Sequence, residues 1–258
     1  MSGKLRLILE YQGSNYHGFQ AQKEAPTIQD ELEKALYQLT KEKNRVIGAS
    51  RTDSGVHARG QVVTFRTQSA LEPDVFVNGL NHYLPTDIAV REASFVDDSF
   101  HPRRDAHSRE YRYLVLNRAT RSPHFRDNAY LVRGNLDIAV MNQAAAGLIG
   151  VHDFMGFASQ LEAKTNCTVR RVYRAEVTRQ GDFVIFYIVA SAFLPHQVRN
   201  TMGSLLRVGQ GKMTLEEFCS IMDSKIPSQA GPAVPACGLC LIKVNYGKQF
   251  EVNVDENL

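Results

Sequence analysis

The chain has no long apolar run and no sign of export. Among its 258 residues no hydrophobic stretch approaches the ~20 residues that a helix needs to cross a bilayer. The first residues, Met1 to Arg6, lead directly into a strand pattern and lack the layout of a signal peptide. We therefore expect a cytoplasmic protein with no membrane contact.

Cysteine is scarce as well. The four cysteines are too few and too unevenly spaced for a disulfide framework in a chain of this length. Cys237 and Cys240 form one Cys-x-x-Cys, but no second such pair and no His pair at ligand spacing accompanies it. If residues 238–246 form a strand, the two sulfurs face opposite sides of the sheet. The sequence thus predicts no metal site.

Motifs for bound nucleotides are also missing. The chain contains neither a phosphate-binding loop nor a dinucleotide fingerprint. We therefore expect no bound nucleotide cofactor.

The composition that is present is that of a soluble globular protein with clustered positive charge. Apolar residues make up 43% and charged residues 22%, and the length suits one large domain or two ordinary ones. The net charge is only +3, yet arginines cluster at Arg103, Arg104, Arg109, Arg112, Arg118, Arg121, Arg126, Arg170, Arg171, Arg174 and Arg179. Aromatic residues are interleaved with them, which suits a phosphate backbone with stacked bases. Ordinary solvated strand faces would give the same pattern.

The most informative segment is a polar stretch, residues 48–58, between two runs that resemble strands. Arg45-Val46-Ile47 precedes it and Gly60 to Phe65 resume the β-type pattern, so we expect a loop at a sheet edge. Asp53 lies two residues after Arg51, and a nearby cation favours the ionised carboxylate that a nucleophile or base needs. The alternative is an Asx-turn, in which Asp53 caps its own loop.

The rest of the chain alternates strands and helices. The pattern predicts strands at 4–11, 60–68, 88–96, 108–117, 167–178, 183–192 and 238–246, and helices at 28–39, 73–80, 136–148, 193–208 and 215–224. Thr27 and Asn135 are the expected N-caps of the first and third helices, and Gln180-Gly181-Asp182 is a hairpin signal. Residues 118–134 are predicted to be an irregular basic connection.

This order predicts an α+β protein built of two ferredoxin-like (RRM-like) halves. We expect the boundary where Asp98 to Arg104 interrupts the pattern, which gives an N-terminal half of residues 1–103 and a C-terminal half of residues 104–258. The halves should share a central, mainly antiparallel sheet with helices on its outer side. The catalytic cleft is expected between them.

Several strings in this order match one family. Arg51 to Ala58 reads Arg-Thr-Asp-Ser-Gly-Val-His-Ala, and further matching strings are Tyr16 to Gln20, Asn81 to Ile88, Phe100 to Ala106, Arg109 to Tyr113, Val198 to Asn200 and Gly238 to Tyr246. Together they resemble the motifs of the tRNA pseudouridine synthase A (TruA) family. The chain departs from the family at Pro102 and Arg104, where the family has Ala and Phe.

The resemblance implies roles for individual residues. Asp53 is the catalytic residue, Tyr111 lies against the target base and could assist removal of its C5 proton, and Arg199 pairs with the Asp53 carboxylate. Arg51 fills the space left by an extruded nucleotide, and Leu239 lines the uracil pocket. The residues expected to contact tRNA are Phe100, His101, Arg103, Arg104, Arg170 and Arg171.

The resemblance also implies the reaction. Uridine becomes pseudouridine in the tRNA anticodon stem-loop, at positions 38, 39 and 40, on a homodimer that binds tRNA across both subunits. Asp53 either attacks C1′ or removes a proton from C2′, and the sequence does not choose between these routes. Two alternatives stay open, namely the same chemistry on another RNA and a non-catalytic RNA-binding module.

Overall fold

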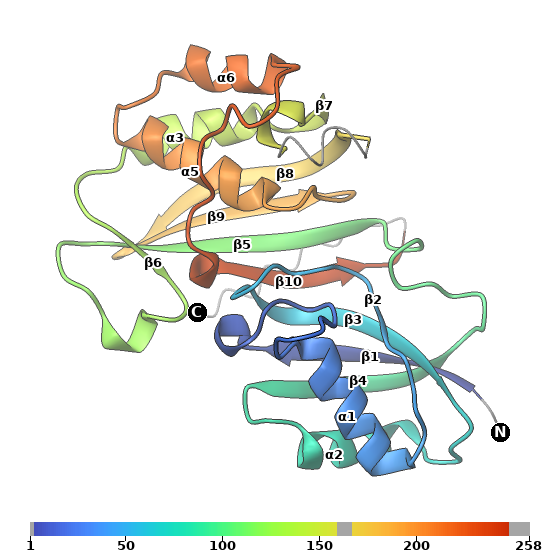
Figure 1. Ribbon diagram of the computed structural model, residues 1–258. Coiled ribbons are helices and arrows are strands. Elements are labelled where there is room, and N and C mark those ends of the chain that lie inside the picture. The colour runs from blue at the N-terminus through green and yellow to red at the C-terminus, as the bar shows by residue number, and fades with distance from the viewer. Residues whose placement is uncertain (1–2, 159–166, 248–258) are drawn as a thin grey trace.

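The computed structural model describes residues 3–158 and 167–247, and these contain a single mixed sheet (Figure 1). The strands are β1 (Gly3–Tyr11), β2 (Ile47–Gly48), β3 (His57–Thr67), β4 (Ile88–Val96), β5 (Ser108–Asn117), β6 (Tyr130–Val132), β7 (Gly150–Asp153), β8 (Val169–Gln180), β9 (Phe183–Ala190) and β10 (Leu239–Asn245). Their order is β4-β1-β3-β10-β5-β9-β8-β7, with β2 beside β3 and β6 beside β5. All pairs are antiparallel except β3–β10 and β5–β6, which confirms the predicted α+β class.

Both halves follow the ferredoxin-like order of strand, helix, two strands, helix and strand. The first half uses β1, α1 (Ile28–Thr40), β2, β3, α2 (Pro73–Tyr83) and β4. The second half uses β5, α3 (Ile138–Ala146), β8, β9, α5 (Gln197–Gly209) and β10, with α6 (Leu215–Asp223) added after α5. The two halves meet at the parallel pair β3–β10. The two predicted ferredoxin-like halves are therefore confirmed, while the division into domains at residue 103, between β4 and β5, stays a prediction.

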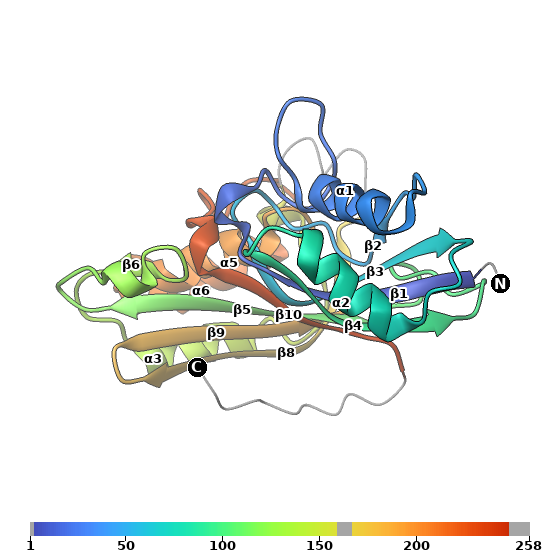
Figure 2. The same cartoon turned by 90° about the horizontal axis from the view of Figure 1, so that it is seen from below.

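The helices pack on one face of this sheet. Figures 1 and 2 show α1 and α2 beside the strands of the first half, and α3, α5 and α6 beside those of the second. One core cluster contains helix residues and alternate strand residues of both halves, among them Leu5, Leu7, Leu32, Phe76, Tyr111, Tyr113, Met141, Phe186, Met202 and Phe218. Because side chains alternate along a strand, Tyr111 and Tyr113 share the helix-covered face and Arg112 has the opposite one.

Local sequence signals explain several element ends. Thr27 caps α1 by accepting the Asp30 N–H, and the hairpin between β8 and β9 turns at residues 181–182 as predicted. The predicted Asn135 cap is wrong, because α3 begins later and Asp137 accepts the Val140 N–H instead. Residues 118–134 are not wholly irregular either, since β6 lies there and pairs with β5.

Within residues 3–158 and 167–247, none of the helices combines the length and the apolar character needed to span a bilayer.

Candidate active site

The loop that carries Asp53 lies in the middle of the sheet, not at its edge. β3, which follows the loop, pairs with β1 on one side and β10 on the other, because the second half extends the sheet there. The loop turns at Gly55, whose φ of +79° favours glycine, and the Val56 N–H closes it by donating to the Asp53 carbonyl at 3.1 Å. Among the described residues no loop N–H donates to the Asp53 side chain, so the Asx-turn alternative does not describe it.

A second loop, residues 12–20, supports the first. The Phe19 N–H donates to the Thr52 carbonyl at 3.1 Å, and the Gly55 N–H donates to the Tyr16 carbonyl at 3.2 Å. A Cβ on Gly18 would lie 2.7 Å from the Thr52 oxygen, and its φ is +90°. Only glycine allows the backbones of the two loops to lie this close, which explains why glycine precedes Phe19 in this loop.

The active-site cavity, as we call the hollow around Asp53, holds about 410 Å³ and draws on both halves. The first half contributes residues 49–53 and Val56. The second half contributes Tyr111 of β5, residues 192–198 and Leu239, the first residue of β10. The structure thus brings seven predicted residues to one place. Six line the cavity, namely Arg51, Asp53, Arg103, Tyr111, Arg170 and Leu239, and Arg199 joins them through its contact with Asp53.

Asp53 and Arg199 form an ion pair across the two halves. Arg199 Nη1 lies 3.3 Å from Asp53 Oδ2, and Arg199 Nε donates to the Val234 carbonyl at 2.8 Å. The side chains are 16% (Arg199) and 24% (Asp53) exposed, so the pair is largely withdrawn from water. Because Arg199 is held at two nitrogens, it fixes the direction of the carboxylate.

His196 is a second partner that sequence reasoning missed. Its Nε2 lies 3.5 Å from Asp53 Oδ2, and its backbone has a left-handed φ of +58° at the start of α5. This conformation is uncommon outside glycine, and such residues cluster at functional sites. The signal available in the sequence was its position three residues before Arg199 at a helix start.

Tyr111 forms one wall of the cavity. Its OH lies 2.9 Å from Ser50 Oγ, and its ring meets Phe193 edge-on with centroids 5.1 Å apart. Burial raises the pKa of Tyr111 to about 12, although its hydrogen bond with Ser50 acts in the opposite direction. The side chain is therefore a neutral phenol at neutral pH.

A buried amide holds the Asp53 loop from behind. Gln61 of β3 is fully buried, and it binds the Ser50 backbone at both ends: Oε1 accepts the N–H at 3.1 Å and Nε2 donates to the carbonyl at 2.6 Å. Tyr11 of β1 adds a hydroxyl contact to Thr52 at 2.8 Å. Sequence reasoning read Gln61 only as a strand residue and missed this clamp.

His57, which ends the Asp53 string, joins three segments. The Gly13 N–H donates to His57 Nδ1 at 3.0 Å, so the ring proton is on Nε2 and donates to the Cys237 carbonyl at 3.1 Å. Burial lowers the pKa of His57 and favours this neutral form. The ring thereby ties the end of the Asp53 loop to the turn just before Leu239.

Three predicted cations surround the active-site cavity. Arg51, Arg103 and Arg170 all line it, and Arg51 and Arg103 are exposed. These positive charges suit an anionic polymer. Arg109, which also lines the cavity, is instead buried and structural, with four backbone carbonyls around its guanidinium.

The other predicted tRNA contacts lie outside this cavity. Four predicted residues are not among its lining residues, namely Phe100, His101, Arg104 and Arg171. Phe100 packs on Tyr246 with ring centroids 5.0 Å apart, which gives it a structural role. Arg104 and Arg171 are exposed. Their contacts with RNA stay predictions.

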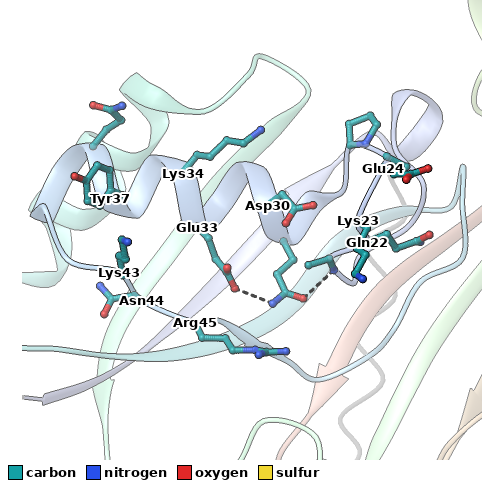
Figure 3. Close-up of a pocket in the computed structure, with 15 residues that line it drawn as sticks. Gln22, Lys23, Glu24, Asp30, Glu33, Lys34, Tyr37, Lys43, Asn44 and Arg45 are labelled. Carbon is teal, nitrogen blue, oxygen red and sulfur yellow. Dashed lines mark hydrogen bonds between the residues drawn. The ribbon is translucent and has the colours of Figure 1, made fainter.

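A larger hollow beside α1 has no comparable chemistry. It holds about 1000 Å³ between α1 and the segments at residues 21–26 and 43–45 (Figure 3). Both cations and carboxylates line it, and Gln29 links Glu33 to the Ala21 N–H.

Within residues 3–158 and 167–247 no group of three His, Cys, Asp or Glu side chains could hold a metal ion, and Cys237 and Cys240 are free thiols.

Comparison with known proteins identifies the family. The family model described as tRNA pseudouridine synthase matches residues 7–104 and 144–247. The tRNA pseudouridine synthase A of Citrifermentans bemidjiense is 43% identical over 96% of this chain and 99% of its own length. The proteins of the same name from Thermoanaerobacter sp. and Shewanella sediminis are 42% and 41% identical, over 93% and 96% of this chain and 98% and 95% of their own lengths. With the motif order, the two-half fold and these matches in agreement, the chain belongs to the tRNA pseudouridine synthase family.

Proposed function

We propose that this protein isomerises uridine to pseudouridine in the tRNA anticodon stem-loop, at positions 38, 39 and 40. The observation that carries the proposal is the Asp53 carboxylate, ion-paired to Arg199 at 3.3 Å in a cavity walled by Tyr111 and Leu239. A half-buried, oriented carboxylate beside an apolar wall suits reaction at a sugar carbon more than phosphate or metal binding. The family membership and the motif resemblance support the substrate.

The reaction rearranges bonds within one nucleotide. The bond from C1′ to N1 breaks, uracil turns within the cavity, and C5 bonds to C1′. C5 then loses its proton and N1 gains one, so the product is an isomer. Asp53 either attacks C1′ or takes the C2′ proton. Both routes need one carboxylate and no redox partner.

The neighbouring side chains retain the detached base. The ring of Tyr111 stacks on uracil, and Leu239 and Phe193 keep water from the cavity, so uracil does not escape. With its pKa raised to about 12, the phenol is almost entirely protonated at neutral pH in the free protein, so it offers almost no phenolate to accept a proton. We therefore assign Tyr111 a stacking role. It takes part in proton transfer from C5 only if the bound substrate changes the environment of the phenol.

A stacked uridine must leave its helix to reach Asp53. Extrusion costs a few kcal/mol, and a side chain that fills the gap offsets part of this. Arg51 is exposed, lies two residues before Asp53 and lines the same cavity. We assign it this role, with Arg103 and Arg170 binding the flanking phosphates.

We further propose a cytoplasmic homodimer in which one tRNA crosses both subunits. The resemblance to the family supports this assembly, and the proposed tRNA substrate supports the compartment. Sedimentation of the protein with and without tRNA tests the stoichiometry.

Tritium release tests the function directly. A tRNA transcript carrying C5-tritiated uridine should release tritium in proportion to pseudouridine formed, because C5 exchanges its hydrogen for carbon. Mapping the product should place pseudouridine at 38, 39 and 40 alone, and a transcript with cytidine at these positions should release none. Modification elsewhere would favour another RNA target, and no release at all would favour a non-catalytic module.

Replacing Gln61 should slow the reaction without weakening tRNA binding. Gln61→Leu keeps the volume but removes both contacts to the Ser50 backbone, so the Asp53 loop loses its support. We expect turnover to fall about 10- to 100-fold, since small displacements of a reacting group have such effects. Single-turnover rates and tRNA affinity measured together check this. An unchanged rate would show that the loop holds its position without Gln61.

A further inference from the structure

A second cavity lies on the sheet face opposite the helices. Along β5 the side chains alternate, so Arg112 points away from the face that carries Tyr111. Its register partner on β10 is Cys240, and both line a cavity of about 550 Å³ together with Arg59 of β3. We call this the rear pocket. The sheet itself separates it from Asp53.

Two guanidinium groups of the rear pocket lack an acidic partner. Within the part of the chain that the structure describes, neither Arg112 nor Arg59 forms a side-chain hydrogen bond or an ion pair, and the buried Nε of Arg112 has no acceptor. Burial lowers the pKa of Arg112, and the charge of Arg59 acts in the same direction. A half-buried cation beside a second cation and without a counterion is unfavourable, which points to a missing anion.

The carboxylates at the rim do not supply that anion. Asp87 already accepts hydrogen bonds from the Tyr16 hydroxyl and the Asn15 amide. Glu10 is paired with Arg91 at 3.8 Å. Within the described residues neither carboxylate forms an ion pair with Arg59 or Arg112, so both guanidinium groups keep donors that no acid of the pocket uses.

We propose that the rear pocket binds a phosphate group. A phosphate presents the charge and the paired oxygens that two guanidinium groups recognise best. The remaining lining offers further donors from Gln12, Thr86 and Asn128 and aromatic faces from His124 and Phe125, which suit a nucleoside attached to the phosphate. The phosphate can come from a free nucleotide or from the RNA backbone, and the second source rests on the proposed function.

Titration of the full-length protein with inorganic phosphate and with uridine 5′-monophosphate tests the site. Arg112→Gln and Arg59→Gln should each weaken the saturable binding about tenfold or more, because each removes a charge-assisted pair of hydrogen bonds. Arg174→Gln is the matched control. Arg174 lies on the same sheet face, but its guanidinium already pairs with Glu176 and lies over the Tyr187 ring. Phosphate and nucleotide binding by Arg174→Gln should therefore equal that of the parent. Tritium release from an isolated anticodon stem-loop should be unchanged in all three variants.

Full-length tRNA distinguishes the two sources. If the RNA backbone occupies the pocket, Arg112→Gln should weaken tRNA binding and lower the slope of log affinity against log salt by about one. If a free nucleotide occupies it, tRNA binding should stay unchanged while nucleotide binding falls. The structure places Arg59 on the surface, so Arg59→Gln tests the site even if Arg112→Gln folds poorly.

Two results would overturn the proposal. One is phosphate and nucleotide binding by Arg59→Gln and Arg112→Gln that equals binding by the parent. The other is a change in oligomeric mass for Arg112→Gln, which would assign the guanidinium to a carboxylate of a second copy.

Discussion

Asp53→Asn is expected to abolish pseudouridine formation while tRNA binding persists. The amide has nearly the shape of the carboxylate, so the loop closed by Gly55 and Val56 is retained. It can neither attack C1′ nor take a proton from C2′, because it has no negative charge. We expect turnover to fall by about 10⁴-fold or more, the scale on which enzymes lose activity without their central nucleophile or base.

The measurement is single-turnover tritium release together with tRNA affinity. Asp182→Asn serves as the matched control, since Asp182 lies in the β8–β9 turn and pairs with Arg118 at 3.4 Å, on a separate part of the surface. Its turnover should equal that of the parent. Measurable turnover by Asp53→Asn after removal of contaminating enzyme would take the catalytic role away from Asp53.

Arg199→Ala has the second largest expected effect. The guanidinium holds Asp53 Oδ2 and the Val234 carbonyl at once, so its loss frees the carboxylate and leaves the His196 ring as the remaining side chain beside it. Removal of one preorganised charged donor from an active site typically costs about 10²-fold or more in rate. We expect a loss of that size in turnover, with tRNA affinity changed far less.

The control for this variant lies on the same helix. Arg207→Ala removes an exposed arginine two turns further along α5 and should leave the rate unchanged. Unfolding by urea should show that both variants remain folded. A rate for Arg199→Ala within a few-fold of the parent would mean that the ion pair does not position Asp53 for reaction.

The strands and helices followed from periodicity because their signals are local. Thr27, the β8–β9 turn and the alternation around Tyr111 each act within a few residues. The short strands β6 and β7 did not follow, since each becomes a strand only by pairing with a distant one, β6 with β5 and β7 with β8. The start of α3 moved for a similar reason, as the Asp137 N–H donates to the Gly209 carbonyl at the end of α5.

The residues of the candidate site also differ in whether the sequence alone could reveal them. The Asp53 loop was found from its composition, but its partner Arg199 lies 146 residues away and was reached through family resemblance alone. Gln61 and His196 act through contacts that no spacing rule encodes, one behind the loop and one across the cleft. Arg112 lacks a partner because of which side chains β3, β5 and β10 place around it, so the sequence of any one strand does not reveal this.

The parallel pairing of β3 with β10 has a consequence for biosynthesis. β10 supplies Leu239 and joins the halves, yet it is synthesised after every other described strand. A nascent chain can fold its first half early, but the cavity around Asp53 stays incomplete until β10 has been made. A fragment that stops before β10 should therefore contain the Asp53 loop without the wall that Leu239 provides.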